Sequence, residues 1–488
     1  MVKKAVIIAA GMGSRLNGNA GNLPKPLVQV AGVGLLKRTI LSAKRAGITE
    51  FVVVIGYRGA EIRDAVSRDS QVDVHIDWVE NTDWEKGNGL SVLKAQPYVD
   101  EPFLLMMSDH LFESEVLFKL RYQPVGPGEA VLCVDYDLDR IHDMEDATKV
   151  FIDGDQILHI GKELESFNAV DTGIFVCSAS LFDGIETALA LGDESLSGGI
   201  RVLAARGAMR SVGIDGLFWL DVDTPEALRH AERSLIGQLG KPTDGFVSRH
   251  FNRKISTRIS GLLARTPVTP NQISIFTMLL TILSAWLISL GDYVTLAVAG
   301  VLFQFASIID GCDGEIAKLK FMGSPVGEWI DTIADNTSYI VFFVGVSYGM
   351  YTVTGEGYVL ALGLTAVALI ILGISLMAVY LQNVGSGSLA SFNQAFSAEV
   401  PEEKRGWFHR ASCSVKFAFR RDFFALVFCV LALANLLVAI YWIVVIGTAL
   451  VSTAVFGYAG PMMRARGIWP STVSPQVEAG KLVSEKAD

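Results

Sequence analysis

At 488 residues the chain is too long for one ordinary domain, so two or more folded units are expected. Its mean hydropathy of +0.40 is high for a soluble protein of this size, and its net charge of −10 argues against general nucleic-acid binding. Charged residues crowd into the first half, and uncharged runs dominate after Asn271. Five cysteines without a CxxC pair are typical of reduced thiols rather than of disulfides or a zinc site.

This change in composition divides the chain into segments. Residues 1–233 are expected to form a cytosolic α/β domain, and residues 266–465, which are rich in apolar runs, an all-α membrane domain. Residues 234–265 form the expected linker between them. Residues 466–488 are polar and lack periodicity, so we expect a disordered tail.

The first predicted strand is the apolar run KAVIIAAG near the N-terminus. With its lysines it also mimics a signal peptide, but an apolar core of about seven residues is short for one, which favours a buried strand. The strand runs into GMGSRLNGNAGNLPKPL, where backbone N–H groups of a glycine-rich turn can cradle a phosphate. No GK[ST] sequence follows that would indicate a Walker loop. The candidate nucleotide contacts are Gly11, Gly13, Arg15 and Lys25.

This strand and loop resemble the nucleotidyltransferase superfamily that builds NDP-sugars and CDP-alcohols on a Rossmann-like, three-layer α/β fold. The resemblance implies that Asp109, which ends the buried strand LLMMSDH, and Asp223, in FWLDVDTPEAL, bind a divalent metal ion. It also implies catalytic roles for Arg15 and Lys25, which would offset charge on the triphosphate. For any single lysine, a solvated surface charge is the alternative. Further implied contacts are Gly87 and Asn88 of EKGNG with the nucleotide, and Lys149, Lys162 and Asp171 with the phosphorylated acceptor.

The predicted linker contains a basic, amphipathic pattern. Apolar residues recur there at helical spacing among five basic residues, at Phe251, Ile255, Ile259 and Leu262. Such a helix is typical of the interface of an anionic cytosolic leaflet. Arg258 is either part of this basic anchor or a ligand for an acceptor phosphate.

Long charge-free runs predict the membrane spans. These runs, the last of them long enough for two helices, are 272–290, 293–309, 336–355, 357–382 and 423–462. Six transmembrane helices are therefore expected. Lys and Arg gather instead before the first run, at 404–421 and at 464–466, which the positive-inside rule places in the cytosol. We expect a multi-pass protein of the cell membrane with both candidate sites on the cytosolic side.

Four aspartates lie between the second and third predicted spans, Asp310 with Asp313 and Asp331 with Asp335. The topology places all four at one membrane face, and spacings of three and four residues put each pair on one side of a helix. The cluster would be strongly repulsive without a cation, and carboxylate oxygens suit Mg²⁺ or Mn²⁺. Solvated helix ends are the alternative, but acids this near a bilayer are unfavourable and usually functional.

The stretch DGCDGEIAK, followed after eight residues by GEWIDTIAD, resembles the D-x2-D-G-x2-A-R-x8-G-x3-D-x3-D signature of the CDP-alcohol phosphotransferase family. That family has six transmembrane helices and moves a phospho-alcohol from a CDP carrier to an acceptor hydroxyl, with release of CMP. The resemblance implies that the four aspartates hold two divalent cations and that Asp335 is the catalytic base. Lys318 replaces the usual arginine, so the charge is kept but the bidentate fork is lost. The implied nucleotide contacts are Asp313, Gly314, Ala317 and Lys318.

The combination of the two domains resembles the bifunctional inositol-1-phosphate cytidylyltransferases and CDP-inositol:inositol-1-phosphate transferases. The stretches that carry this resemblance include EKGNG, MSDH, VDTGIF, RKISTRIS and QFASIIDGCDGEIA. It implies CTP, inositol 1-phosphate and CDP-inositol as substrates, and phosphorylated di-inositol phosphate as the product. Asn336 stands where relatives often have arginine, so another phospho-alcohol or a lipid acceptor is the alternative. A nucleotide-sensing transporter is remote, because the acids do not cross the membrane midplane and no repeat of the spans is evident.

The oligomeric state follows from the same resemblance. The membrane family is generally dimeric, so a homodimer in the lipid bilayer is expected. Small residues that offer close-packing surfaces between protomers are Gly345, Gly349, Gly363 and Gly373.

Overall fold

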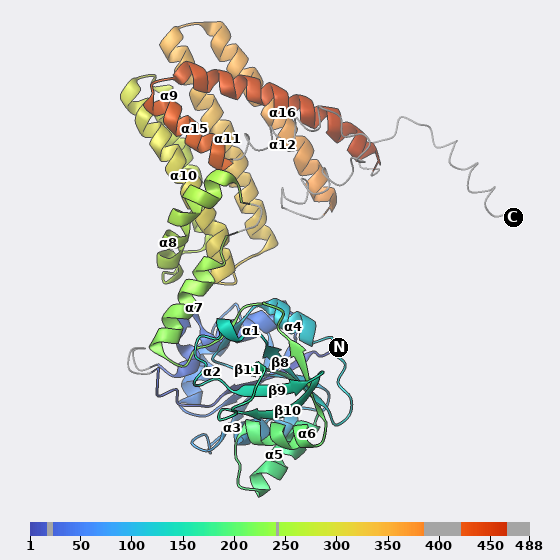
Figure 1. Cartoon of the computed structure of the whole chain (residues 1–488). Helices are drawn as coiled ribbons and strands as arrows, with labels where there is room; N and C mark the ends of the chain where they lie inside the picture. The colour runs from blue at the N-terminus through green and yellow to red at the C-terminus, as the bar shows by residue number, and fades with distance from the viewer. Residues whose placement is uncertain (17–22, 241–243, 385–420, 466–488) are drawn as a thin grey trace, which may run out of the picture. The chain divides into compact units, whose positions relative to one another are not determined.

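The computed structural model describes residues 1–16, 23–240, 244–384 and 421–465. The chain divides into two compact units, Met1–Leu235 and Ile236–Asp488. The first is built on a large β-sheet, and the second is built from helices (Figure 1). Each unit contains one of the two groups of candidate residues.

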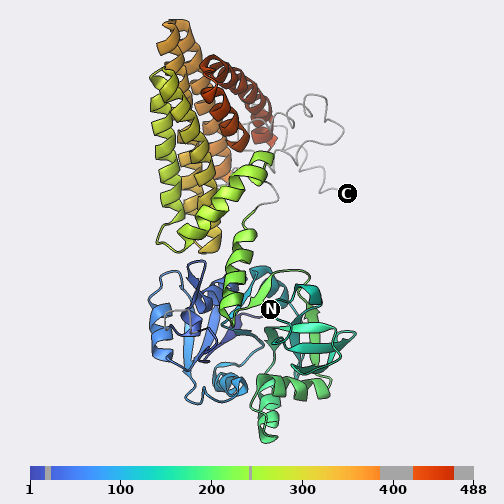
Figure 2. The ribbon, with the colours of Figure 1, turned by 60° about the vertical axis from the view of Figure 1, so that its left-hand side comes forward.

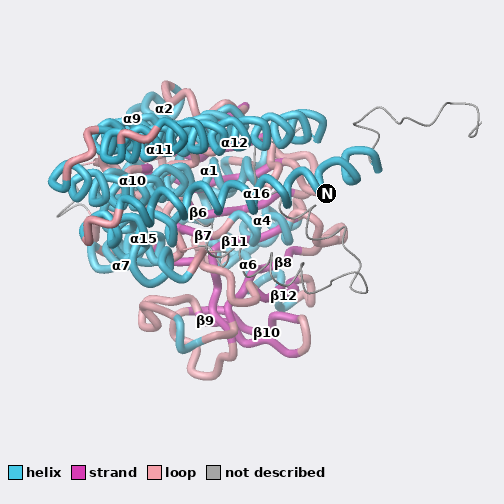
Figure 3. Tube along the Cα trace, turned by 90° about the horizontal axis from the view of Figure 1, so that it is seen from above, coloured by secondary structure: helices cyan, strands magenta, loops and turns pink. Residues whose placement is uncertain are grey.

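A nine-stranded mixed sheet forms the centre of the first unit. In spatial order its strands are β5 (His75–Glu80), β4 (Glu50–Ile55), β1 (Lys4–Ala9), β6 (Phe103–Met107), β11 (Ala169–Cys177), β8 (Ala130–Asp135), β12 (Met209–Gly213), β10 (Gln156–Gly161) and β9 (Lys149–Asp153). The first four run parallel, and β11 is antiparallel to both β6 and β8. Figure 3 shows β9 and β10 together at one edge of the sheet.

The sheet is buried on both faces. Successive side chains of a strand point to opposite faces, and on β1 both sets are buried. On β1, Val6 and Ile8 belong to one apolar cluster, whereas Ala5 and Ile7 belong to another. The run KAVIIA is therefore a buried strand, as the sequence predicts.

Helices cover both faces of the sheet. They are α1 (Leu35–Arg45), α2 (Gly59–Ser67), α3 (Asn88–Lys94), α4 (Ser114–Leu120), α5 (Ser180–Ala190) and α6 (Leu196–Ala205). Helix α7 (Pro225–Gly237) instead packs in a separate apolar cluster with Val30 and Leu111. Leu36 of α1 and Leu117 of α4 pack into one apolar cluster, whereas Phe182 of α5 and Ile200 of α6 pack into the other. Figure 1 shows α1 and α4 on one side of the sheet and α3, α5 and α6 on the opposite side. This arrangement is the Rossmann-like α/β fold that the sequence predicts.

Two short ribbons lie outside the large sheet. One pairs β2 (Gln29–Val30) with β3 (Val33–Gly34), and the other pairs β7 (His110–Phe112) with β13 (Trp219–Asp221). In the second ribbon the strands are antiparallel, and Asp221 lies directly opposite His110. The ribbon thus brings together two polar residues that are far apart in sequence.

The second unit is helical. After a short π-helical turn (Ser248–Asn252), its helices are α8 (Arg253–Ala264), α9 (Pro270–Ser289), α10 (Tyr293–Leu319), α11 (Pro325–Thr354), α12 (Gly357–Val384), α15 (Arg421–Leu433) and α16 (Leu437–Ala465). Figure 2 shows the long helices of this unit lying side by side. Phe303, Phe342 and Phe428 stack where α10, α11 and α15 meet. This aromatic contact anchors α15 beside the helices that carry the aspartates.

Each of the first four charge-free runs falls on one helix, and the last falls on two, α15 and α16. In the described part of the chain, three helices are long and apolar enough to cross a bilayer: α9, α10 and the Gly357–Leu376 part of α12. Polar residues interrupt α11, and the described part of α15 has only 13 residues. The expectation of membrane helices is therefore met, while the count of six spans stays a prediction.

The helices that carry the aspartates extend beyond the apolar runs. α10 continues to Leu319 and α11 already begins at Pro325, where the Ser324 side chain accepts the N–H of Gly327. All four aspartates therefore lie inside helices rather than in a connecting loop, and helical spacing governs where they point.

Three glycines expected between protomers pack inside the unit instead. A Cβ on Gly345 or Gly349 would collide with the backbone of α9, and a Cβ on Gly363 would collide with a side chain of α11. Only glycine lets these helices approach so closely. The prediction that these three glycines face a second protomer is therefore wrong. At Gly373, no described atom lies within 4 Å of the Cβ position.

Candidate functional site

The candidate nucleotide loop starts where β1 ends, at the edge of the sheet where open α/β folds bind ligands. Gly13 has a φ of +63°, and a Cβ there would collide with the side chain of Lys25. Glycine is needed at this position so that Lys25 can lie against the loop. Gly11 is exposed, and residues 17–22 lie outside the described part of the chain.

Lys25 joins the two aspartates that the sequence predicts as metal ligands. Its side chain is 9% exposed, and its Nζ lies 2.5 Å from Asp109 Oδ2 and also pairs with Asp223 Oδ1. Arg15 Nη2 lies 2.8 Å from Asp223 Oδ2. Burial disfavours the charge of Lys25, but the two carboxylates outweigh it and raise the lysine pKa. Burial also disfavours charge on Asp109, yet Lys25 and His110 lower its pKa to about 2, so this carboxylate is ionised at neutral pH.

Asp109 also belongs to a group that can hold a metal ion. His110 Nε2 lies 3.8 Å from Asp109 Oδ1 and 3.7 Å from Asp221 Oδ2. One ligand atom from each of these three residues lies within 4.8 Å of the others. His110 Nδ1 lies 2.7 Å from the carbonyl oxygen of Thr172, and metal-binding histidines commonly donate their second N–H in this way. Asp223, the second ligand expected from the sequence, is instead held by Lys25 and Arg15.

Gly173 makes room for the His110 ring. Its φ is +71°, and a Cβ on it would collide with the imidazole. Asp171 Oδ1 accepts the N–H of Gly173 at 2.6 Å, and burial raises the pKa of Asp171 to about 6. Asp171, expected from the sequence to contact the acceptor, therefore also stabilises the irregular stretch of β11 that faces His110.

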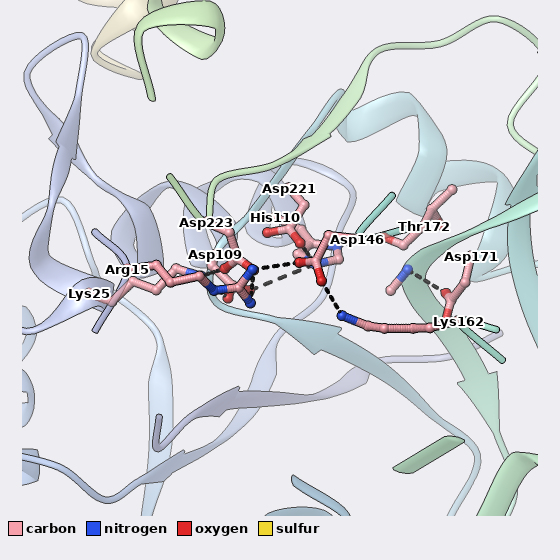
Figure 4. Close-up of polar contacts among 11 residues, drawn as sticks. Arg15, Lys25, Asp109, His110, Asp146, Lys162, Asp171, Thr172, Asp221 and Asp223 are labelled. Atoms are coloured by element: carbon pink, nitrogen blue, oxygen red, sulfur yellow. Dashed lines mark hydrogen bonds and ion pairs between the residues drawn. The ribbon is translucent and has the colours of Figure 1, made fainter. Parts of the chain in front are cut away.

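Asp146 connects the nucleotide loop to one of the expected acceptor contacts. Its Oδ2 lies 2.7 Å from Arg15 Nη1, and its Oδ1 lies 2.5 Å from Lys162 Nζ. Figure 4 shows Asp146 between these two cations, close to Asp223 and Asp109. Sequence reasoning missed this residue because it lies in a polar loop without a motif.

Gly87, Asn88 and Lys149 have structural contacts of their own. A Cβ on Gly87 would collide with the backbone of Glu194. The Asn88 side-chain oxygen accepts the N–H of Leu196 at 2.8 Å, which ties the start of α3 to the start of α6. Lys149 Nζ lies 5.5 Å from the ring centroid of Phe167. The structure thus gives each of these residues a role in packing besides the substrate contact that the sequence predicts.

In the second unit, three of the four motif aspartates come together. Asp310 and Asp313 of α10 and Asp331 of α11 each offer a carboxylate oxygen, and these oxygens lie within 4.8 Å of one another. The Ser274 hydroxyl of α9 donates to Asp313 Oδ2 at 2.7 Å. Three clustered carboxylates on neighbouring helices suit a hard divalent cation.

Asp335 lies beside this group and is paired with an arginine. Arg421 Nη1 contacts Asp335 Oδ1 and lies 2.7 Å from Asp310 Oδ1. Sequence reasoning used this arginine only as part of a basic cluster that sets membrane topology. The cluster did carry a signal, because Arg421 lies two residues before the start of a long apolar run.

The remaining motif residues follow along α10. Gly314 and Ala317 are half-buried, and Lys318 Nζ donates to the backbone oxygen of Gln238 at 2.7 Å. Arg258 is exposed on α8. Among the described residues, no ion pair joins Lys318 or Arg258 to the aspartates.

Comparisons with known proteins agree with both units. Residues 5–203 match the model of the MobA-like NTP transferase domain, and residues 267–451 match that of the CDP-alcohol phosphatidyltransferases. A bifunctional IPC transferase and DIPP synthase of Thermococcus kodakarensis is 40% identical over 336 residues, which cover 68% of this chain and 73% of that protein. The protein of the same name from Archaeoglobus fulgidus is 38% identical over 334 residues, 68% of this chain and 63% of that protein. A solved structure, the inositol-1-phosphate CTP transferase from T. maritima, is 29% identical, with a TM-score of 0.42, and the match covers 47% of this chain and 94% of that one.

The fold and the two sites define a two-domain transferase, in which a nucleotidyltransferase is joined to a membrane-associated CDP-alcohol phosphotransferase. Its relatives are named as bifunctional enzymes. The chain belongs to the family of bifunctional IPC transferases and DIPP synthases.

Proposed function

We propose that this chain catalyses two consecutive transfers. In the first, a phosphate oxygen of inositol 1-phosphate attacks the α-phosphorus of CTP, and pyrophosphate leaves, which gives CDP-inositol. In the second, a hydroxyl oxygen of another inositol phosphate attacks the inositol-bearing phosphorus of CDP-inositol. The bond to CMP breaks, CMP leaves, and the product is a phosphorylated di-inositol phosphate.

The observation that carries this proposal is the presence of two separate carboxylate groups, one in each unit. One lies in the unit that matches an NTP transferase and the other in the unit that matches a CDP-alcohol enzyme. The first unit makes the class of compound that the second consumes. The names of the relatives support inositol phosphate as the alcohol.

In the first site, the side chains of this chain bind and orient phosphates. Lys25 and Arg15 lie on the nucleotide loop and carry the positive charge that would stabilise the leaving pyrophosphate. Lys162 is the cation on the acceptor side. It reaches Asp146 and would exchange that carboxylate for the phosphate of inositol 1-phosphate. Such positioning brings the attacking oxygen in line with the α-phosphorus.

In the second site, Asp335 is the proposed general base. Its carboxylate would take the proton from the acceptor hydroxyl as that oxygen attacks phosphorus. Arg421 favours the ionised form of Asp335 by direct pairing. Half-buried Gly314 and Ala317 leave room for the nucleotide along α10.

Both carboxylate groups fit a divalent cation, with Asp109, His110 and Asp221 in one and Asp310, Asp313 and Asp331 in the other. A bound Mg²⁺ or Mn²⁺ would neutralise phosphate charge and stabilise the leaving oxygen. In the first group the Thr172 carbonyl orients the His110 ring, and in the second Ser274 orients Asp313. Asp223 and Asp335 adjoin these groups and are proposed as additional ligands.

We further propose that the second unit spans the membrane six times as a homodimer, with both sites in the cytosol. The exposed apolar side chains of α8 and of the π-helical turn before it support an interfacial position, since Phe251 of the turn is 47% and Leu262 of α8 is 71% exposed. Crosslinking in native membranes tests the dimer, and a yield of monomer alone would contradict it. Protease accessibility of the two units in sealed vesicles tests the orientation.

Mass spectrometry of the products tests the chemistry. Purified protein given CTP, Mg²⁺ and inositol 1-phosphate should release pyrophosphate, then CMP, and form a water-soluble diester of two inositols. A panel of other phospho-alcohols should be used less efficiently. A product that extracts into organic solvent would instead assign a lipid acceptor, and turnover of another phospho-alcohol in preference to inositol 1-phosphate would overturn the substrate assignment.

A further inference from the structure

The segment ahead of the first predicted span buries polar side chains, which its predicted role as an amphipathic membrane-surface helix does not explain. This segment runs from Asp244 through α8 and lies outside residues 267–451, which match the membrane family. From Asn252 to the end of α8, which packs against α10, the buried residues recur every four positions: Asn252, Ser256, Ser260 and Ala264. Three of these four residues are polar, which is unusual for a helix that only lies on a membrane surface.

A buried charge chain joins this segment to α10. Glu315 has a side chain that is 1% exposed, and its Oε1 pairs with Arg253 Nη1 and accepts the Ser256 hydroxyl at 2.6 Å. Arg253 in turn binds both oxygens of Asp244, at 2.9 and 3.0 Å. Separating Glu315 from Arg253 would leave a buried carboxylate without a cation and would strongly destabilise the protein. The ion pair therefore holds α8 against α10.

The turn of α10 beside Glu315 needs such support. It carries Gly311 and Gly314, which have low helix propensity, and Asp310 and Asp313, whose like charges lie one turn apart. Its rear side rests on α8. Arg253 Nη1 lies 3.5 Å from the carbonyl oxygen of Gly311.

The same segment also touches the helix that carries Arg421. The N–H of Ser248, in the π-helical turn, donates to Asp422 Oδ2 at 2.7 Å. Arg421 is the next residue and pairs with Asp310 and Asp335. The segment therefore contacts α10, which carries Asp310 and Asp313, and α15, which carries Arg421.

We propose that Arg253 and Glu315 are positioning residues for the metal group of the second unit. Their ion pair, anchored by Asp244, holds the Asp310–Asp313 turn so that its carboxylates meet Asp331. The segment from Asp244 to Ala264 is thus a working part of the phosphotransferase, and not only a linker or a membrane anchor. The proposal rests on the transfer reaction proposed above, but it concerns metal binding and can be tested without turnover.

The test measures Mn²⁺ binding to the full-length protein in detergent by electron paramagnetic resonance. All samples carry Asp109→Asn, which weakens the metal group of the first unit. Glu315→Gln keeps the shape of the side chain and removes its charge, and it should weaken Mn²⁺ binding by roughly 10- to 100-fold, as is typical when a residue behind a metal ligand is lost. The matched control is Glu356→Gln, an exposed acid beyond the opposite end of α11, which should bind Mn²⁺ like the parent.

A second variant covers the case in which Glu315→Gln does not fold. Arg253→Lys keeps the charge but cannot bind Asp244 and Glu315 together, so it should weaken Mn²⁺ binding by less than Glu315→Gln. Parent-like Mn²⁺ affinity in either folded variant would overturn the proposal. A separate assay distinguishes failure of the proposed function. Wild-type protein that releases no CMP from CDP-inositol and inositol 1-phosphate would overturn the proposed function, and the metal-binding result would stand.

Discussion

Asp335 is paired with Arg421, a residue that lies 86 positions further along the chain. The arginine also contacts Asp310, so a single guanidinium links two of the four motif carboxylates. The motif alone does not contain this cation. The charge on the proposed general base therefore depends on a helix outside the motif.

Replacement of that base tests its role directly. We expect Asp335→Asn to reduce CMP release by roughly 10² to 10⁴, the usual effect of losing a general base. Cytidylyl transfer should continue in the first unit, so CDP-inositol should accumulate from CTP. Quantifying CMP and CDP-inositol in one reaction checks both expectations, with Glu356→Gln as the control. Wild-type CMP release from a folded Asp335→Asn protein would remove Asp335 from the mechanism.

The two sites should fail separately. Asp109→Asn removes a carboxylate that contacts Lys25 and belongs to the first metal group, so pyrophosphate release from CTP should fall by at least roughly 10²-fold. Transfer from supplied CDP-inositol should stay near the wild-type rate, because that reaction uses the second group. Loss of both activities in a folded variant would show that the sites are not independent.

Gly173 should matter through His110. Gly173→Ala places a methyl group against the imidazole, so it should lower cytidylyl transfer by roughly 10- to 100-fold, as His110→Ala should. The double variant should be no worse than the poorer single variant, since both act on one side chain. Gly154→Ala is the matched control, because Gly154 also has a positive φ but no described atom within 4 Å of its Cβ position. Equal losses for both glycine variants would assign the effect to backbone strain alone.

Asp193 provides a prediction for stability against pH. Hydrogen bonds from Ser195 and the charge of Arg201 lower its pKa in the folded state. A carboxyl with a lowered folded pKa contributes stability above its unfolded pKa, and this contribution is lost as the pH falls through the folded value. Because solvent screens this partly exposed carboxylate, Asp193→Asn should reduce the free energy of unfolding by only about 0.5–1 kcal/mol at pH 7. Unfolding curves of both proteins should converge as the pH is lowered below about 4, the ordinary pKa of Asp, and a constant difference would contradict this.

Local patterns predicted the residues that act through their own helix or strand. Asp310 and Asp313 point together because three residues make almost one helical turn. Asp109 was found through the resemblance to nucleotidyltransferases, which implies a metal-binding aspartate at the end of this buried strand, and β6 ends two residues before it. Gly345 shows the limit of such patterns. Its small size indicated close helix packing, but composition could not tell whether the neighbour was α9 or a second protomer.

Long-range pairs were missed for a physical reason. Glu315 and Arg253, like Asp335 and Arg421, meet only after helices distant in sequence have packed, and no periodicity within one segment encodes such a contact. His110 was missed although it adjoins Asp109, because its partner Asp221 is brought to it only by the β7–β13 ribbon. Asp146 lies in a loop, where neither helical nor strand spacing applies.

The β7–β13 ribbon limits which insertions and deletions the loop between β12 and β13 can accept. Its three residue pairs set His110 opposite Asp221, and a slip of one position would turn Asp221 to the other side of its strand. An insertion or deletion between β12 and β13 is thus tolerated only if the ribbon re-forms in the same register. The side chains of the loop at residues 214–218 can vary. Relatives with insertions or deletions in this loop should still pair the residues equivalent to His110 and Asp221 across the ribbon.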